Sequence, residues 1–153
     1  MRAKLGLVEH REEDIDLIAD LLSLMEESRA DYTLTFRALS HWPVTGDAGA
    51  ALPQWTDNRD TLAAWLDRYR ARLVAESEND EALRQRMLST NPRYVLRNWI
   101  AQNAIDSAEH RNFALVDELR RLFEQPFDEH PGMERFAQPA PDDAPPLVVS
   151  CSS

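Results

Sequence analysis

The sequence predicts an all-α fold: a bundle of about five to six helices, followed by a proline-rich, extended C-terminal tail. Apolar residues recur every three or four positions through most of the first 124 residues, a spacing that gathers them on one side of a helix. No alternating apolar and polar pattern is strong enough to indicate a β-sheet. From Gln125 onward the helical spacing disappears, and six of the nine prolines lie there. We therefore expect a helical module at residues 1–124 and a tail at residues 125–153, ending in Cys-Ser-Ser.

The first two helices are expected near residues 12–28 and 31–40. The apolar stripe of the first consists of Ile15, Ile18, Leu21, Leu22 and Met25. Asp31 is a suitable N-cap for the second helix, because its carboxylate can accept hydrogen bonds from free backbone N–H groups of the first turn. The buried side of that helix would hold Tyr32, Phe36 and Leu39. Prolines and glycines then predict a loop between His41 and Gln54.

Four further helices are expected after this loop. The next helix should span residues 57–77 and bury Leu62, Trp65, Leu66, Tyr69 and Leu73, with Arg59, Arg68, Arg70 and Arg72 mostly outside. A short helix with Leu83, Met87 and Leu88 must stop before Asn91-Pro92, because proline disfavours helical geometry in the residue before it. Asn91 would cap the next helix, which carries Val95, Leu96, Trp99, Ile100 and Ala104 and ends near His110. The last helix is expected over residues 113–123, with Leu115, Leu119 and Leu122 inside.

The tail has no helical periodicity, so we expect it to be extended, disordered or wrapped over a surface. Its apolar run Leu147–Val149 would suit an anchor docked on the helical body.

The net charge of −10, from 27 acidic and 17 basic residues, argues against a nucleic-acid or anionic-membrane partner, because the surface would repel both. No apolar run approaches the roughly 20 residues that span a bilayer, and no signal peptide follows the first four residues. We expect a soluble, cytoplasmic protein of bacterial type, although a targeting signal could lie upstream of Met1.

The sequence suggests no catalytic, cofactor-binding or metal-ligating residue. Its four histidines are scattered without metal-ligand spacing, and the glycine-rich phosphate loops and the Gly-x-Ser-x-Gly motif are absent. An acidic cluster, formed by Glu12, Glu13, Asp14 and Asp16, could bind a cation, but acids at a helix start are more simply explained by the helix dipole. Arg37 is expected to pair with a neighbouring acid. The group Arg93, Arg97 and Asn98 could hold a phosphate or a partner, or could be the basic edge of a helix.

Cys151 is the one candidate for thiol chemistry. It is the only cysteine, so it has no disulfide partner within this chain. A thiol in a mobile terminus would be accessible to oxidants or a partner thiol, whereas the alternative is an inert tail residue.

Four segments together resemble the C-terminal part of the selenoprotein O family: residues 2–7 (Arg-Ala-Lys-Leu-Gly-Leu), 31–37 (Asp-Tyr-Thr-Leu-Thr-Phe-Arg), 91–99 (Asn-Pro-Arg-Tyr-Val-Leu-Arg-Asn-Trp) and 150–153 (Ser-Cys-Ser-Ser). Some members of this family carry selenocysteine at the position of Cys151. In one respect the tail departs from the family, because relatives often have a tryptophan after Pro-Pro-Asp, whereas residues 141–146 read Pro-Asp-Asp-Ala-Pro-Pro.

The resemblance implies a part of a kinase-like fold that transfers AMP from ATP, with Mg2+ or Mn2+, to serine, threonine or tyrosine hydroxyls of proteins. The nucleotide-binding lysine, the metal-holding acids and the catalytic base would lie upstream of Met1. This chain would then be a structural or regulatory helical part that binds no cofactor alone. Its partners would be the upstream catalytic segment and, for the complete enzyme, protein substrates. The family also implies that Cys151 pairs with an upstream cysteine in some relatives.

The sequence leaves two other functions open. The chain could be a stand-alone helical interaction module without catalytic activity, or Cys151 could be a redox centre in its own right. Met1 could begin a truncated gene product, an excised domain or a fragmentary reading frame.

Overall fold

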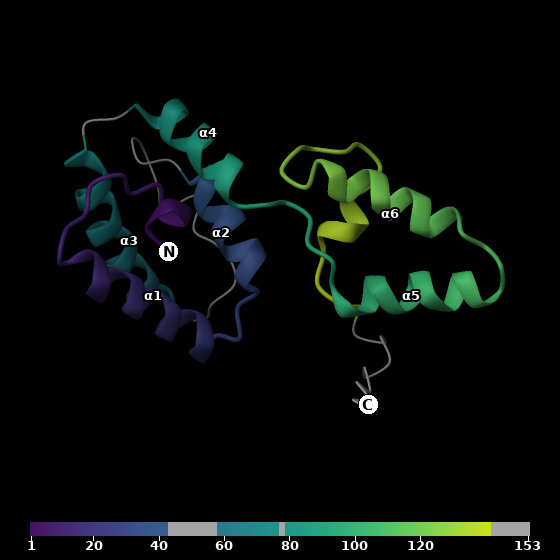
Figure 1. The fold of residues 1–153 in the computed structure, drawn as a ribbon. Coiled ribbons are helices and arrows are strands. Elements are labelled where there is room, and N and C mark those ends of the chain that lie inside the picture. Colours follow the sequence, from purple (N-terminus) through teal and green to yellow (C-terminus); the bar gives the residue numbers. More distant parts are fainter. Residues whose placement is uncertain (43–57, 77–78, 142–153) are drawn as a thin grey trace. The chain divides into compact units, whose positions relative to one another are not determined.

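The computed structural model describes residues 1–42, 58–76 and 79–141, and this part of the chain contains helices and no strand (Figure 1). The all-α prediction is therefore confirmed for the described residues. The α-helices are α1 (Asp14–Glu27), α2 (Tyr32–His41), α3 (Arg59–Val74), α4 (Asp80–Thr90), α5 (Asn98–Glu109) and α6 (Ala114–Glu124). Two short 3-10 helices are η1 (Arg2–Leu5) and η3 (Glu134–Ala137).

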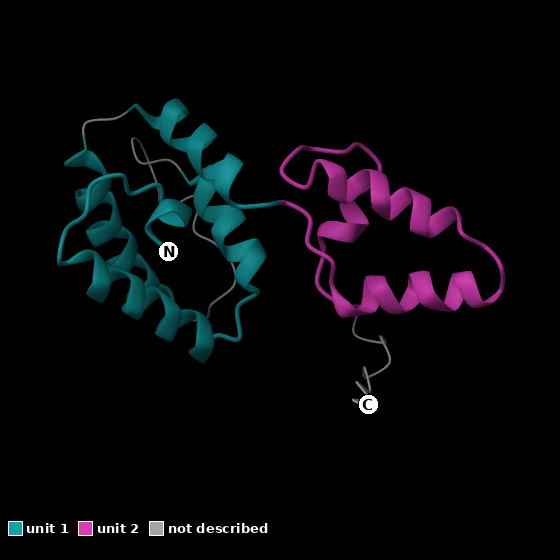
Figure 2. Ribbon diagram, viewed as in Figure 1, with its two compact units in different colours: residues 1–92 teal, residues 93–153 magenta. Residues whose placement is uncertain are grey.

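The chain separates into two compact units, Met1–Pro92 and Arg93–Ser153, which we call unit 1 and unit 2 (Figure 2). The expected division between a helical module at residues 1–124 and a tail at residues 125–153 is a different boundary and stays a prediction. The proposed anchor Leu147–Val149, Cys151 and most of the loop expected at residues 41–54 lie outside the described residues.

Unit 1 is built from two packed helix pairs, with α1 against α3 and α2 against α4, and η1 contacts both α2 and α4 (Figure 1). Its core contains every apolar residue that the sequence predicted for the inner face of α3: Leu62, Trp65, Leu66, Tyr69 and Leu73. The indole Nε1 of Trp65 donates a hydrogen bond to the carbonyl of Leu17 at 2.8 Å, and this bond joins α3 to α1. The large aromatic side chains of α3 are therefore part of the core of unit 1, and Trp65 also bonds this helix to α1.

The buried face of α1 differs from the expected stripe. Leu17, Leu21, Leu24 and Met25 are buried, whereas Ile15 and Leu22 are 68% and 39% exposed. Asp14 is buried on the same side of the helix, three residues before Leu17, because it pairs with Arg72 of α3. This polar contact sets which face of α1 is turned inward, and apolar spacing alone does not reveal it.

Side-chain caps mark the starts of three helices. Asp31 accepts a hydrogen bond from the backbone N–H of Leu34 at 2.9 Å, which confirms it as the N-cap of α2. Asn79 accepts one from Ala82 at 2.9 Å at the start of α4. The side chain of Asn58 does the same for α3. These bonds satisfy backbone donors that have no partner inside the helix.

The prediction that Asn91 caps a helix beginning at Pro92 is wrong. Asn91 is the C-cap of α4, and α5 begins only at Asn98. The backbone N–H groups of Arg93 and Tyr94 donate to the carbonyl of Pro126 at 2.9 and 3.0 Å, so this stretch bonds to a later part of unit 2. The segment is therefore held in a non-helical conformation by contacts that are distant in sequence.

In unit 2, α5 and α6 run antiparallel, and η3 follows them (Figure 1). Its core consists of Tyr94, Ile100, Leu119, Leu122, Phe136 and Ala137. The last two belong to η3 and lie within the stretch expected to lack regular structure. Of the three states considered for the tail, residues 125–141 fit a chain wrapped over helices, because they bury Phe136 against them.

Candidate functional site

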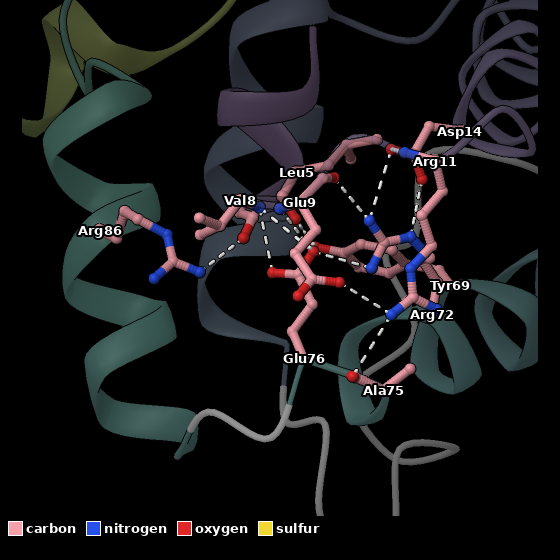
Figure 3. Close-up of polar contacts among 11 residues, drawn as sticks. Leu5, Val8, Glu9, Arg11, Asp14, Tyr69, Arg72, Ala75, Glu76 and Arg86 are labelled. Carbon is pink, nitrogen blue, oxygen red and sulfur yellow. Dashed lines mark hydrogen bonds and ion pairs between the residues drawn. The ribbon is translucent and has the colours of Figure 1, made fainter.

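A buried polar cluster surrounds Arg72 of α3 (Figure 3). Its guanidinium Nε donates to Asp14 Oδ1 at 2.7 Å, and Nη1 donates to Glu76 Oε1 at 2.7 Å. Its Nη2 donates to the carbonyl oxygen of Glu9 at 2.8 Å. The side chains of Arg72, Asp14 and Glu76 are only 8%, 2% and 6% exposed. The expectation that Arg72 lies mostly outside is therefore wrong.

Glu76 connects this cluster to the N-terminal segment. Its carboxylate accepts hydrogen bonds from the backbone N–H of Val8, at 3.0 Å to Oε2, and of Glu9, at 3.1 Å to Oε1. Nearby, the hydroxyl of Tyr69 donates to the carbonyl of Leu5 at 2.7 Å (Figure 3). Side chains of α3, together with Glu76 just after it, thus bond to the backbone of the N-terminal segment at Leu5, Val8 and Glu9.

The cluster shifts the proton affinities of its members. Burial alone would raise the pKa of Asp14, but the hydrogen bonds from the Arg72 side chain and the Arg11 backbone, with the charge of Arg72, outweigh it and lower that pKa. For Glu76 burial is likewise the largest opposing influence, and bonds from the Val8 backbone and Arg72 lower its pKa. The same carboxylates overcome burial at Arg72 and raise its pKa. All three groups are held in their charged forms.

This arrangement is suited to holding structure rather than to proton transfer. A general acid or base needs a pKa near the working pH, whereas the pKa values of Asp14 and Glu76 are moved away from neutrality. The acidic cluster proposed at the start of α1 is also divided by the fold, because Asp14 is buried and Glu12, Glu13 and Asp16 are exposed. The helix-dipole explanation missed the role of Asp14, since its partner lies 58 residues away.

A second polar cluster, which we call the Asn91 junction, consists of Lys4, Arg37, Ser40 and Asn91. The Asn91 side chain donates from Nδ2 to the Lys4 carbonyl at 2.8 Å and to Ser40 Oγ at 3.0 Å. Its backbone carbonyl accepts from Arg37 Nη1 at 3.0 Å, and the same Nη1 reaches the Leu88 carbonyl at 3.3 Å. Arg37 thus bonds to two carbonyl groups at the end of α4, and its expected pairing with a neighbouring acid stays a prediction.

The members of the other basic group singled out in the sequence, Arg93, Arg97 and Asn98, have different surroundings. Arg93 makes an ion pair with Glu129 at 2.9 Å and lies over the ring of Tyr94, with 5.7 Å from its guanidinium carbon to the ring centroid. Arg97 is the N-cap residue of α5, and Asn98 is the first residue of that helix and exposed. Arg93 therefore serves to fasten the start of unit 2 to the segment around Glu129.

Unit 2 has a surface cleft beside α6. Its lining combines apolar and charged side chains, including Leu115, Leu122, Met133, Arg121, His130 and Arg135. Arg135 in this lining is paired with Glu118 at 2.9 Å.

In the described part of the chain, no three His, Cys, Asp or Glu side chains come together as possible ligands of one metal ion. No helix in that part is long and apolar enough to cross a membrane. The reactivity of Cys151 stays a prediction.

Comparison with known proteins gives matches to one family. A family model described as protein adenylyltransferase SelO matches residues 1–124. The protein nucleotidyltransferase YdiU of Thioalkalivibrio sulfidiphilus is 50% identical over 156 residues, covering 100% of this chain and 31% of the relative. The protein of the same name from Myxococcus xanthus is 46% identical over 155 residues, covering 100% of this chain and 32% of the relative. The chain thus spans about a third of the length of these curated relatives.

Proposed function

Because the chain belongs to the SelO family, as its motifs indicated, we propose that it is the C-terminal part of a protein nucleotidyltransferase and supports the catalytic segment. The observation that carries this proposal is the match over residues 1–124 to a family whose members are about three times as long. In this proposal the complete enzyme transfers AMP from ATP to serine, threonine or tyrosine hydroxyls of proteins. We also propose a cytoplasmic location for it, in line with its bacterial relatives.

The nucleotide and its Mg2+ or Mn2+ ion would bind to the part of the enzyme outside this chain. The buried carboxylates of unit 1 do not fit a metal site, because Asp14 and Glu76 are both engaged by the guanidinium of Arg72. A divalent cation would have to displace that guanidinium, and the N-terminal backbone donors would also lose their acceptor. The engagement of these carboxylates by Arg72 supports the proposed structural role of unit 1.

The test is transfer of labelled AMP from ATP in the presence of Mg2+ or Mn2+, with three samples. The first is this chain alone, the second is the chain joined to its upstream genomic segment, and the third is the upstream segment alone. We expect transfer only when both parts are present. Transfer by the isolated chain would refute the supporting role, and no transfer by the joined protein would refute the proposed activity.

A second candidate function is a stand-alone interaction module without catalytic activity. The observation that favours it is the number of large apolar side chains exposed on unit 2, among them Leu96 at 60%, Ile105 at 52% and Phe113 at 58%. Such surface marks an interaction site when it is contiguous. A translation start signal directly before Met1, with no kinase-like segment in frame, would support this function, whereas an in-frame upstream segment would support the first.

A further inference from the structure

Three of the four segments that carry the family resemblance meet in unit 1, although they are far apart in the sequence. Lys4 belongs to the first segment, Arg37 to the second and Asn91 to the third. The Lys4 ammonium also lies 5.5 Å from the ring centroids of both Tyr32 and Phe36, which belong to the second segment. The fold therefore collects these segments around one residue, Asn91.

The backbone and side-chain polar groups of Asn91 are all engaged in hydrogen bonds. Asn91 is 1% exposed. Its backbone N–H donates to the Met87 carbonyl at 2.8 Å, and its side-chain Oδ1 accepts from Lys4 Nζ at 3.4 Å. With the two bonds from Nδ2 and the one from Arg37, these contacts connect η1, α2 and α4. A buried amide with so many partners holds its surroundings in one arrangement, because a displaced partner would be left without a hydrogen bond.

The hydrogen bond between Asn91 and Lys4 connects two residues at opposite ends of the sequence of unit 1. Asn91 is the C-cap of α4 and is followed by Pro92, the last residue of unit 1, whereas Lys4 lies in η1 at the start of that unit. The junction therefore joins the start of unit 1 to its end. Any segment before Met1 and all of unit 2 are attached at these two points.

We infer that Asn91 is a positioning residue of the complete enzyme, because it fixes the place where the chain enters unit 1 relative to the place where it leaves. This inference rests on the proposed function. If the catalytic segment lies upstream, the Asn91 junction fixes its point of attachment relative to the point at which the chain leaves unit 1. A small misplacement of reacting groups can lower a rate by about 100-fold, so loss of this constraint should reduce activity beyond its effect on folding.

The experiment uses the chain joined to its upstream segment and compares Asn91→Ala with Trp65→Phe. The control substitution also removes a buried hydrogen bond within unit 1, from Trp65 Nε1 to the Leu17 carbonyl, but that bond joins α3 to α1 and involves none of the junction residues. Both variants are measured for thermal stability and for kcat/KM of AMP transfer, well below their unfolding transitions. We expect Asn91→Ala to lower kcat/KM by about tenfold or more, and Trp65→Phe to keep it within about twofold.

Equal losses in both variants, or full activity in Asn91→Ala, would overturn the inference. If Asn91→Ala does not fold, Asn91→Asp replaces it, because that side chain keeps the acceptor for Lys4 and has a carboxylate oxygen in place of the two Nδ2 donors. Activity of Asn91→Asp equal to that of Trp65→Phe would overturn the inference in the same way. If the joined protein without any substitution transfers no AMP, the proposed function is refuted, and the inference with it.

Discussion

Replacement of Arg72 by methionine should destabilise unit 1 severely. The substitution keeps most of the aliphatic stem but leaves Asp14 and Glu76 buried without their cation, and the Glu9 carbonyl without its donor. Loss of one partner from a buried ion pair typically costs about 3–5 kcal/mol, because the remaining charge stays desolvated. Since a protein of this size is stable by only about 5–15 kcal/mol, Arg72→Met should remove a large part of the stability of the unit.

The matched control is Arg68→Met on the same helix. Arg68 also makes an ion pair of 2.7 Å, with Asp20, but the two side chains are 54% and 52% exposed. An exposed pair contributes about 1 kcal/mol or less. Urea unfolding at pH 7, followed by tryptophan fluorescence, should therefore separate the two variants by about 2–4 kcal/mol at an unchanged denaturant slope. A difference below about 1 kcal/mol would refute the assigned role of the cluster.

The cost of Arg72→Met should also depend on pH. In the unchanged chain the pKa values of Asp14 and Glu76 are lowered, so their contribution is complete above the unfolded values near pH 4 and is lost as the pH falls further. Without Arg72 the buried carboxylates should instead resist ionisation, and acid should favour the folded form. The difference in stability between the two proteins should therefore shrink from pH 7 to pH 3.

Three further outcomes are expected. Gly6→Ala should destabilise unit 1 by about 1–3 kcal/mol more than Gly132→Ala destabilises unit 2, as measured by thermal unfolding. Both glycines have positive φ, +71° and +85°, but a Cβ at Gly6 would strike Leu83 and Met87, whereas nothing lies within 4 Å at Gly132; equal costs would contradict the packing argument. Asn79→Ala should cost about 1 kcal/mol by removing the α4 cap, and Asn79→Asp, which keeps the acceptor, should cost less. In the unchanged chain, unfolding free energy should fall on acidification below about pH 4, and Asp14→Asn should flatten this dependence; an unchanged slope would show that Asp14 is not linked to folding.

The sequence predicted the helices better than it predicted their polar contacts. The five apolar residues expected on α3 are all buried, because a wide stripe of large side chains leaves one way to turn the helix inward. On α1 the expected stripe was wrong at Ile15 and Leu22, which are exposed, and the helix instead buries the side that carries Asp14, the partner of Arg72. Helix periodicity depends on neighbours three or four positions away, whereas this pair spans 58 residues.

At the candidate sites, too, contacts between residues distant in the sequence were not predicted. The motif containing Asn91 and Pro92 had the local pattern of a helix start, but Asn91 uses its side chain on Lys4 and Ser40 instead. Arg93 and Tyr94 bond to the Pro126 carbonyl, which no local pattern reveals. The motifs did predict the family correctly, because residue identity at matching positions carries that information. They did not predict that three motif segments would meet at one buried amide.

The two units should differ in how they behave when the chain is isolated. Among the described residues, unit 1 has a core of many large side chains, including Trp65, Tyr69 and Phe36, whereas that of unit 2 is much smaller. A small core gives little stability, so unit 2 should unfold first and should exchange its backbone amide hydrogens faster.

Unit 2 also exposes Ile105 at 52% and Phe113 at 58%, so the isolated chain should self-associate through this unit. Replacement of both residues by serine should shift sedimentation toward the monomer without lowering stability, because neither side chain is buried. The control is Ile15→Ser on α1, where the side chain is 68% exposed in unit 1, and it should leave association unchanged. If the unchanged chain is a single monomeric species at high concentration, or if Ile15→Ser has the larger effect, these apolar side chains are not the surface that holds copies together.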